Sequence, residues 1–404
     1  MSIQSPVIIA GAGPSGCVLA LSLVKQGIPV IMLEKCETLP IDLRASTFHP
    51  PSLEMIADLG DGVIDKMLEK GLHADRYQYR DRSTGEVATF DMSLIADETR
   101  YPFRLQLEQY ELTHFICDAL KEYDCADVRF GSELVSFEQD ESGVTAIVNT
   151  ASGSERIQGS YLVGAEGARS VVRKQSGIGY MGFTYDEKFL VVSTSFPFED
   201  VFEDFSYVNY VSDPEEWCVI LRTDKLWRVL VPVFPASEEE EAYYLSDEFV
   251  QSRLKRLYAR DVDYDIHHRS IYAVNQRVAE IYHRGRTLLV GDACHINNPL
   301  GGMGMNGGLH DAFNLADKLQ KVILEGADPE ACFGLYDRQR RELAVQFVQR
   351  HTIENKKLME ARDPDVQRKR QQMLMETAAD PVRAKDFLLE RSMINCVRES
   401  LAVQ

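Results

Sequence analysis

Short apolar runs separated by glycine dominate the start of the chain. Residues 7–10 form a β-branched run that stops at a glycine, as a buried parallel strand does. Apolar residues then recur with helical spacing over 14–26, and Gly27 is placed to end that helix. A second apolar run, 30–33, ends at Glu34. The pattern therefore predicts a strand–helix–strand unit at the start of the chain.

The middle of the chain has a different pattern, in which strand-like runs alternate with turn-forming residues. Four such runs lie at 190–194, 206–211, 217–221 and 227–231. They predict an antiparallel sheet in a second domain. The acidic run 238–241 is interpreted as a solvated loop and helix start, leading into a helix expected at 246–258.

The last third returns to a buried strand followed by helices. Residues 287–290 are expected to form the strand, and a long helix is expected from about 306 to 325. The tail after Asp363 is charged and helical in pattern. Its apolar positions between 386 and 401 should pack onto their own domain, and a dimer contact is the alternative.

The turn after the first strand reads Gly11-Ala12-Gly13-Pro14-Ser15-Gly16. In such a GxGxxG turn the first glycine permits the tight bend, the second lets the backbone approach a pyrophosphate, and the third lets helix and strand pack closely. The helix start then faces the diphosphate with free N–H groups. Glu34, followed by Lys35, ends the second strand, where a carboxylate can accept hydrogen bonds from an adenosine ribose. These residues predict a dinucleotide site.

A second glycine-rich signature follows the strand expected at 287–290. It comprises Gly291-Asp292-Ala293-Cys294-His295, then Pro299, Gly301, Gly302, Gly304 and Asn306, and finally Asp311. Asp292 can accept from a ribityl or ribose hydroxyl, or it can cap a helix. The glycines allow close approach to a flat ring, and the N–H groups of Met305 and Asn306 would stabilise negative charge at a flavin's O2. The two signatures together predict one FAD gripped at both ends, with His295 as a structural residue.

In order along the chain, these segments resemble the single-component FAD-dependent aromatic hydroxylases, the family of para-hydroxybenzoate hydroxylase. The second signature is similar to that family's second FAD motif. Residues 161–173 resemble its middle motif, although Glu166-Gly167 stands where the family has Asp-Gly. The family uses that motif for FAD and for nicotinamide, so the role of Glu166 stays open. The resemblance spans roughly residues 5–320.

The resemblance implies further cofactor contacts. Gln109 resembles the family's helix-start glutamine, and Arg44 resembles an arginine near the flavin phosphates. Pro299 is the family position beside the reactive edge of the flavin, where its carbonyl could face the substrate; a plain turn proline is the alternative. The candidate FAD-binding residues are Gly11, Gly13, Pro14, Ser15, Gly16, Glu34, Lys35, Arg44, Gln109, Asp292, Pro299, Gly302, Gly304, Met305 and Asn306.

The fold class that the resemblance implies is mixed α/β (α+β), with a Rossmann-like FAD-binding domain and an inserted antiparallel-sheet substrate domain, as in para-hydroxybenzoate hydroxylase. We expect the FAD-binding domain to comprise 1–75, 106–180 and 276–330. The substrate domain is expected at 76–105 and 181–275, and a C-terminal helical segment at 331–404.

The resemblance also implies a monooxygenase. NADH or NADPH would reduce FAD, and O2 would form a C4a-hydroperoxyflavin that hydroxylates a phenolic or heteroaromatic small molecule. No second GxGxxG follows a strand, so no dedicated nicotinamide domain is expected. The resemblance implies that NADH or NADPH instead visits a surface cleft. Pro299, Tyr210 and Arg222 are the catalytic candidates, with Tyr207 and Tyr272 as further substrate contacts. A tyrosine could help ionise a phenol and an arginine could hold a carboxylate, while sheet packing is the alternative for each.

Two other interpretations stay open. The same fold could carry out epoxidation, halogenation or saturation of an isoprenoid, although no Trp-x-Trp-x-Ile-Pro segment is present. A non-catalytic flavin-binding sensor is the other alternative, and reductant consumption stimulated by a phenol would distinguish it.

The amino-acid composition disfavours several classes of binding partner. The chain of 404 residues has 44 Lys and Arg against 63 Asp and Glu, a formal charge of −19, which disfavours nucleic acid and anionic membranes. Its eight cysteines show no zinc spacing, so we expect no metal and free thiols. No signal peptide or membrane span is evident. We therefore expect a cytoplasmic monomer or homodimer with no nucleic-acid or membrane partner.

Overall fold

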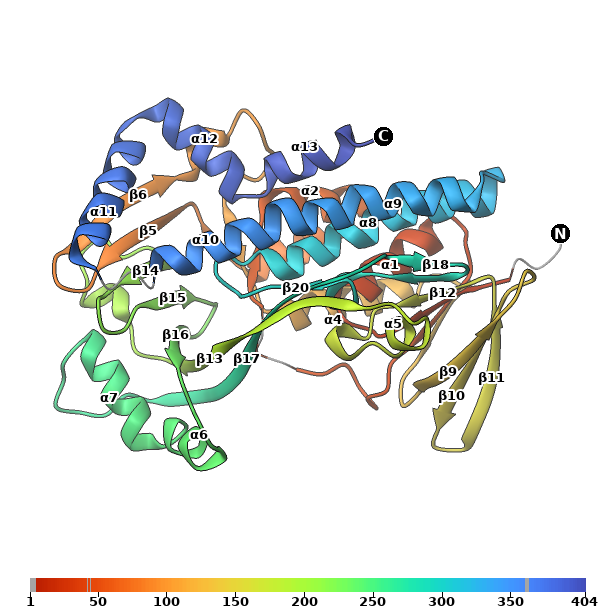
Figure 1. Cartoon of the computed structure of the whole chain (residues 1–404), viewed down its shortest axis with the longest axis horizontal. Helices are drawn as coiled ribbons and strands as arrows, with labels where there is room; N and C mark the ends of the chain where they lie inside the picture. The colour runs from red at the N-terminus through yellow and green to blue at the C-terminus, as the bar shows by residue number, and fades with distance from the viewer. Residues whose placement is uncertain (1–4, 42, 44, 360–362) are drawn as a thin grey trace.

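The structure is a computed structural model that describes residues 5–41, 43, 45–359 and 363–404 (Figure 1). Among these residues, one six-stranded sheet has the order β18-β19-β12-β1-β2-β8. All neighbouring pairs are parallel except β18 with β19. The strands are β1 Val7–Ala10, β2 Val30–Leu33, β8 Ala126–Arg129, β12 Tyr161–Gly164, β18 His283–Arg284 and β19 Thr287–Leu289. The predicted strands at 7–10 and 30–33 are thus neighbours in this sheet, and β12 separates them from the predicted strand at 287–290.

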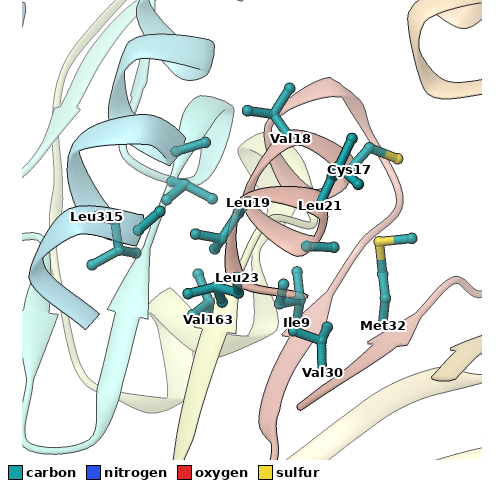
Figure 2. Close-up of a cluster of buried hydrophobic side chains, with 14 of the residues drawn as sticks. Ile9, Cys17, Val18, Leu19, Leu21, Leu23, Val30, Met32, Val163 and Leu315 are labelled. Atoms are coloured by element: carbon teal, nitrogen blue, oxygen red, sulfur yellow. The ribbon is translucent and has the colours of Figure 1, made fainter. Parts of the chain in front are cut away.

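Helix α1, Pro14–Lys25, is buried along almost its whole length because it is enclosed on several sides. It packs on the sheet and against α4, Gln109–Leu120, and α8, Met303–Glu325. Figure 2 shows Leu19 and Leu23 between Val163 of the sheet and Leu315 of α8. Each such buried leucine stabilises the fold by about 1.5–3 kcal/mol. Helix α8 begins three residues before the predicted start, so the glycine signature itself forms its first turn.

In the described part of the chain, the larger sheet has eight strands in the order β20-β17-β13-β16-β15-β14-β5-β6. Its pairs are antiparallel apart from β14 with β5. The strands are β5 Arg76–Asp81, β6 Gly85–Asp91, β13 Tyr180–Thr194, β14 Val208–Ser212, β15 Cys218–Arg222, β16 Trp227–Val233, β17 Ile266–Ala279 and β20 His295–Ile296. The four middle strands that the sequence pattern predicted are β13 to β16.

The two faces of the eight-stranded sheet carry separate apolar clusters, because side chains alternate along each strand. One face holds Tyr77, Tyr79 and Tyr210 and packs against the C-terminal helices. We call it the inner face. The other holds Phe198 and Trp227 and is covered by α6, Glu238–Tyr244, and α7, Asp247–Leu257. We call it the outer face. The acidic run 238–241 therefore forms the first turn of a helix, capped by the Ser237 hydroxyl.

Smaller elements complete the fold. One small sheet, three-stranded and antiparallel, was not predicted from the sequence: it comprises β9 Glu133–Gln139, β10 Val144–Thr150 and β11 Gly153–Gly159. A second small sheet joins β3 Thr47–Phe48, β7 Arg104–Gln106 and β4 Leu72–Ala74. Its central strand, β7, follows β6 of the larger sheet along the chain and precedes β8 of the six-stranded sheet. Arg104 of β7 contacts Tyr210 in the site described below.

The C-terminal helices connect the two large sheets (Figure 1). Helix α9 packs on α8, and α11 and α12 pack on the β5–β6 end of the larger sheet. Phe387 of α12 stacks on Phe90 with ring centroids 4.4 Å apart, and Leu388 is fully buried. The tail therefore packs onto its own chain. The helices are α9 Pro329–Leu343, α10 Arg350–Met359, α11 Pro364–Ala379, α12 Pro381–Arg391 and α13 Ile394–Ala402, with a π-helical segment at Ala344–Gln349.

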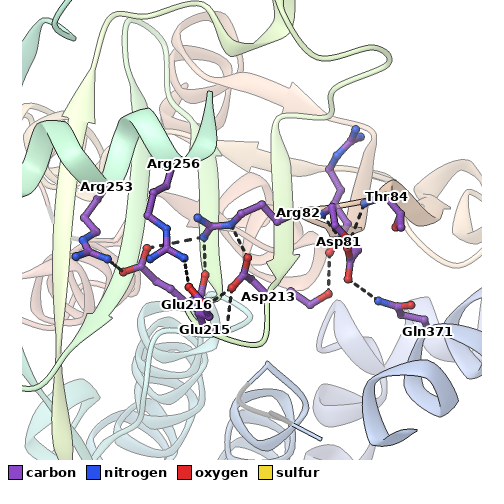
Figure 3. Close-up of polar contacts among 12 residues, drawn as sticks. Asp81, Arg82, Thr84, Asp213, Glu215, Glu216, Arg253, Arg256 and Gln371 are labelled. Atoms are coloured by element: carbon purple, nitrogen blue, oxygen red, sulfur yellow. Dashed lines mark hydrogen bonds and ion pairs between the residues drawn. The ribbon is translucent and has the colours of Figure 1, made fainter. Parts of the chain in front are cut away.

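A polar network holds the far end of the larger sheet to α7 and α11 (Figure 3). Arg82 Nε lies 3.1 Å from Asp213, and Arg253 pairs with Glu216 at 2.9 Å. Gln371 of α11 donates to Asp81 at 2.8 Å. These contacts fix the loops that follow β5 and β14 relative to the helices.

Three properties of the described residues bear on the partners. None of the helices is long and apolar enough to cross a membrane. No group of three or more His, Cys, Asp or Glu side chains is arranged to hold a metal ion, within the ranges given above. The eight cysteines are free thiols.

Candidate active site

The first glycine turn is locked against the middle motif by backbone contacts. Gly11 has φ +106°, and a Cβ there would lie 2.5 Å from the Ala165 carbonyl oxygen. A Cβ on Gly16 would lie 2.1 Å from the Gly11 oxygen. By contrast, a Cβ on Gly13 would meet nothing within 4 Å. Gly11 and Gly16 are therefore required by the fold itself, while Gly13 faces open space that a pyrophosphate can enter.

The second signature meets the first through Ser15. A Cβ added to Gly291, whose φ is +62°, or to Gly308 would lie 2.6 Å from the Ser15 hydroxyl oxygen. The start of α1 and the strand-to-helix segment of the second signature are thus in direct contact. Segments about 280 residues apart in sequence form one continuous surface, as the two-ended dinucleotide prediction requires.

Both helix starts lack a side-chain cap. Gly13 precedes α1 and Gly302 precedes α8, and neither helix has an N-terminal side-chain hydrogen bond. Backbone N–H groups in a first helical turn have no intrahelical partner, and they favour anions. In α8 these belong to Met303, Gly304 and Met305. The expectation that the N–H groups of Met305 and Asn306 face the flavin's O2 stays a prediction.

The side-chain amide of Asn306 forms three hydrogen bonds to backbone groups. It is fully buried, accepts from the His49 N–H at 2.9 Å, and donates to the carbonyls of Thr47 and Gly302 at 2.9 and 2.7 Å. It therefore joins β3 to the start of α8. His49 Nε2 lies 2.8 Å from the Gly301 oxygen. Burial, with a contribution from the charge of Arg104, lowers the pKa of His49 to about 3, so this ring is neutral.

The acidic residue at the end of β2, Glu34, is held in place by two backbone hydrogen bonds. Glu34 is buried, and its two oxygens accept from the N–H groups of Ala12 and Cys36, each at 3.0 Å. This holds the carboxylate beside the first glycine turn, where a ribose would lie. Lys35 is exposed. Asp292 is exposed and is not a helix N-cap, and its backbone carbonyl accepts from the Tyr180 hydroxyl at 2.8 Å.

The carboxylate of the middle motif has a structural task. Glu166 accepts from the Ser170 hydroxyl at 2.7 Å and from the N–H groups of Val171 and Val172 at 3.1 and 3.0 Å, at the start of α5, Val171–Gln175. Burial raises its pKa, although these hydrogen bonds act in the other direction. Arg173 then donates to the Ala293 carbonyl at 3.1 Å, which joins the middle motif to the second signature.

A buried ionic triad supports the second signature. Asp311 accepts from His295 Nε2 at 2.8 Å, from Arg340 Nε at 2.7 Å and from the Gly291 N–H at 3.2 Å. All three side chains are at least nine-tenths buried. His295 is therefore structural, as expected. Arg340, on α9, was missed by the sequence analysis because nothing in the sequence pairs it with a residue 29 positions earlier.

The remaining cofactor candidates lie at the edge of this surface. Gln109 is the first residue of α4, and its N–H donates to the Ala45 carbonyl at 3.0 Å. Arg44 lies outside the described residues. The Pro299 carbonyl accepts from the Gly302 N–H at 3.0 Å and so closes a turn. Its role beside the flavin stays a prediction.

A small cavity lies on the inner face of the larger sheet, next to the second signature. Tyr210 stacks on Tyr79 with centroids 5.2 Å apart, and the Tyr210 hydroxyl accepts from Arg104 at 3.3 Å. Leu300, the residue after Pro299, forms another wall. The lining residues are Tyr79, Tyr210, Leu300, Asn355, Met359 and Arg370. The last three come from the C-terminal helices, a segment in which the sequence analysis identified no site residue.

Two of the substrate candidates lie on the outer face, on the side of the sheet opposite the cavity. Arg222 is on the outer face, where it sits over the Trp227 ring at 5.6 Å and 3.8 Å from Glu199. Tyr207 also contacts Trp227. Strand alternation explains both positions. Tyr207 and Arg222 are each three residues from an inner-face residue, Tyr210 and Val219 respectively, and an odd separation along a strand places a side chain on the opposite face. Tyr272 is opposite Phe189, on the inner face. The structure thus brings Tyr210, but not Arg222, to the cavity near Pro299.

Comparisons with known proteins agree with this geometry. A sequence model of the FAD binding domain family matches residues 4–351. The para-nitrophenol 4-monooxygenase of Pseudomonas sp. (strain WBC-3) is 30% identical over 404 residues, covering 98% of this chain and 97% of that protein. The 6-hydroxy-3-succinoylpyridine 3-monooxygenase of Pseudomonas putida (strain DSM 28022 / S16) is 31% identical over 359 residues, covering 88% and 89%.

Solved structures give the same result. The p-nitrophenol 4-monooxygenase of Pseudomonas putida DLL-E4 superposes with a TM-score of 0.90 at 28% identity, over 97% of this chain and 99% of that one. A flavin-dependent monooxygenase solved with FAD and substrate gives 0.79 at 25% identity, over 99% and 73%. The chain therefore belongs to the family of FAD-dependent aromatic hydroxylases. It is a flavoprotein monooxygenase, and the predicted fold class and the FAD cofactor are confirmed.

Proposed function

We propose that this flavoprotein hydroxylates a phenolic or hydroxylated heteroaromatic small molecule, with NADH or NADPH as electron donor and O2 as oxygen source. The observation that carries the proposal is the pair of stacked tyrosines, Tyr79 and Tyr210, on the inner face beside Leu300 of the second glycine signature. The relatives named for a nitrophenol and a hydroxypyridine match almost the full chain, and they support this substrate class.

Different residues would bind different parts of FAD. The start of α1 at Gly13 would take the pyrophosphate, and Glu34 the adenosine ribose. The free N–H groups of Met303, Gly304 and Met305 would stabilise negative charge on the flavin ring, as an oxyanion hole does. When bound, FAD supplies the electron transfer and the oxygen chemistry.

The cavity as it stands has room for about one water molecule, so its side chains would have to move apart before they could bind and orient an aromatic ring. Tyr79 and Tyr210 present ring faces, while Leu300 and Met359 exclude water from the reacting carbon. The Tyr210 hydroxyl can exchange hydrogen bonds with a phenol and so can orient it and help move its proton.

The test is the visible spectrum of the purified protein, followed by consumption of NADH and NADPH across a panel of phenols, aminophenols and hydroxypyridines. The proposal requires flavin absorbance, reductant consumption stimulated by an aromatic, and an oxygenated product. Flavin without stimulated turnover on any member of the panel would reject hydroxylation and favour a sensor or another reaction. Size-exclusion chromatography of the same sample decides between a monomer and a homodimer.

A further inference from the structure

Two cysteine thiols meet between α1 and α4, close to the first glycine turn. Cys17 directly follows Gly16 in α1, and Cys117 lies in the last turn of α4, which packs against α1. Their sulfur atoms are 3.9 Å apart although the two residues are 100 positions apart in sequence. Figure 2 shows Cys17 on the side of α1 that is turned away from Leu315 of α8. The two thiols are therefore already in contact, so a small movement of either side chain would allow a bond between them.

The two thiols differ in their access to solvent. Cys17 is fully buried, whereas Cys117 keeps 9% of its surface exposed and precedes the exposed Asp118. Reactive cysteines are those that a reagent can reach. A small oxidant from solvent therefore meets Cys117 first, and Cys17 is placed to react with the oxidised Cys117 from inside the protein.

The Cys17 thiol also helps to hold the first glycine turn. Its S–H donates to the Ala12 carbonyl at 3.2 Å. Ala12 stands between Gly11 and Gly13, and its N–H donates to the Glu34 carboxylate at 3.0 Å. The thiol thus supports the backbone that lies between the expected pyrophosphate and ribose positions. A chemical change at Cys17 would be felt at the dinucleotide site.

Hydrogen peroxide is an oxidant that is small and uncharged enough to reach a nearly buried sulfur. The Cys117 sulfur would attack one peroxide oxygen, so that an S–O bond forms, the O–O bond breaks, and the released hydroxide leaves as water with the Cys117 proton. The Cys17 sulfur would then attack the Cys117 sulfur, so that an S–S bond forms, the S–O bond breaks, and a second water leaves with the Cys17 proton. Two thiols are oxidised to one disulfide while one peroxide is reduced to two waters.

We propose that hydrogen peroxide converts Cys17 and Cys117 to a reversible disulfide, and that this disulfide weakens FAD binding. Bond formation brings the sulfurs from 3.9 Å to about 2.0 Å apart and removes the S–H that donates to Ala12. The effect on FAD rests on the pyrophosphate position at Gly13 given under the proposed function, but it needs no aromatic substrate. The loss of one hydrogen bond in the turn should raise the Kd of FAD about two- to tenfold.

The experiment treats the FAD-loaded protein with hydrogen peroxide and then destroys the excess with catalase. Thiols that remain free are alkylated after unfolding, and peptide mass mapping identifies the oxidised residues. We expect a disulfide between Cys17 and Cys117. The Kd of FAD, measured from its release on dilution, should rise about two- to tenfold, and dithiothreitol should reverse both changes.

Two variants make the test specific. Cys117→Ala leaves the Cys17 thiol bonded to Ala12, so its Kd for FAD should match the reduced wild type and should not respond to peroxide. The matched control is Cys218→Ala, because Cys218 is also buried but lies among the outer-face residues of β15. It should respond to peroxide as the wild type does. If Cys117→Ala does not fold, the mapped disulfide and its reversal in the wild type still decide the matter.

Three results would overturn the proposal. The first is that Cys17 and Cys117 stay free under conditions that oxidise the half-buried Cys36. The second is a mapped disulfide with an unchanged Kd for FAD. The third is a peroxide-dependent rise in Kd that persists in Cys117→Ala, which would place the damage elsewhere. FAD affinity of the untreated Gly13→Ala variant tests the pyrophosphate position separately, and reductant consumption by the reduced wild type tests the hydroxylase function.

Discussion

The two ends of the site are built in different ways. At the dinucleotide end the surface is mostly backbone: glycines fit against carbonyls, and uncapped helix starts present N–H groups. At the aromatic end the surface is side chains from β5, β14 and the C-terminal helices, with a buried arginine behind them. This backbone surface leaves no room for an added atom at Gly11, Gly16, Gly291 and Gly308, whereas a side-chain surface can be changed one residue at a time. The first suits a fixed cofactor and the second a variable substrate.

The largest expected effect is a loss of folding stability when the buried ionic triad of Asp311, His295 and Arg340 is broken. Asp311→Asn removes the charge that compensates buried Arg340, and breaking such a buried pair costs about 3–5 kcal/mol. Chemical denaturation would measure it. The control is Asp317→Asn on the same helix, whose pairs with Lys318 and Lys321 are partly exposed and worth about 1 kcal/mol or less. Equal losses in the two variants would contradict a special role for the triad.

The same residue predicts a pH dependence of stability. Burial acts to raise the pKa of Asp311, but the charges of His295 and Arg340 bring it down to about 2. The unfolded value is about 3.9. A folded-state pKa below the unfolded one adds stability that is present above about pH 4 and is lost as pH falls towards 2. Unfolding free energies between these pH values should fall less steeply in Asp311→Asn than in the wild type.

The next effect separates glycines that the fold needs from a glycine that the cofactor needs. Gly16→Ala forces a Cβ into the Gly11 carbonyl and should cost about 1–3 kcal/mol or more even without FAD. Gly13→Ala should leave the apoprotein stable and weaken FAD binding, because its Cβ enters open space. Thermal unfolding of the apoproteins and FAD titration would measure both. An apoprotein destabilised equally by Gly13→Ala would show that this glycine is structural as well.

A smaller effect is expected at the aromatic end. Tyr210→Phe removes one hydroxyl, a hydrogen bond worth about 0.5–1.5 kcal/mol, so the Kd of a phenolic ligand should rise about three- to tenfold. The protein should also lose about 1–3 kcal/mol of stability, because the buried Arg104 Nη1 loses its hydrogen-bond partner, although the ring still stacks on Tyr79. Tyr207→Phe, on the outer face, is the control and should bind normally. A Kd unchanged in Tyr210→Phe would remove this hydroxyl from the binding site.

The smallest effect is expected at Arg222. Its ion pair and its contact with Trp227 lie on the outer face, so Arg222→Gln should change stability by about 1 kcal/mol or less and leave ligand binding unchanged. Denaturation and ligand titration of the same sample check both parts. Weakened binding of an aromatic anion would restore Arg222 as a substrate residue, against its position in the sheet.

The sequence by itself determined the dinucleotide end. Gly11, Gly13 and Gly16 stand at fixed spacing after a strand, and that spacing specifies a local turn whose geometry does not depend on distant residues. The segment from Gly291 was likewise recognisable, because a strand, a turn and a helix start follow one another directly. The strand–helix–strand unit and the FAD cofactor followed from these local patterns and from the family resemblance that they carry.

Only the tertiary structure decided the aromatic end. Whether Tyr210 or Arg222 faces the cavity depends on strand register, and a shift of one residue turns a side chain to the other face. Arg104 has no motif around it, and its hydrogen bond joins it to Tyr210, which is 106 positions away. Asn355, Met359 and Arg370 reach the cavity because the C-terminal helices fold back over the sheet. Long-range packing, which no local spacing encodes, places these side chains.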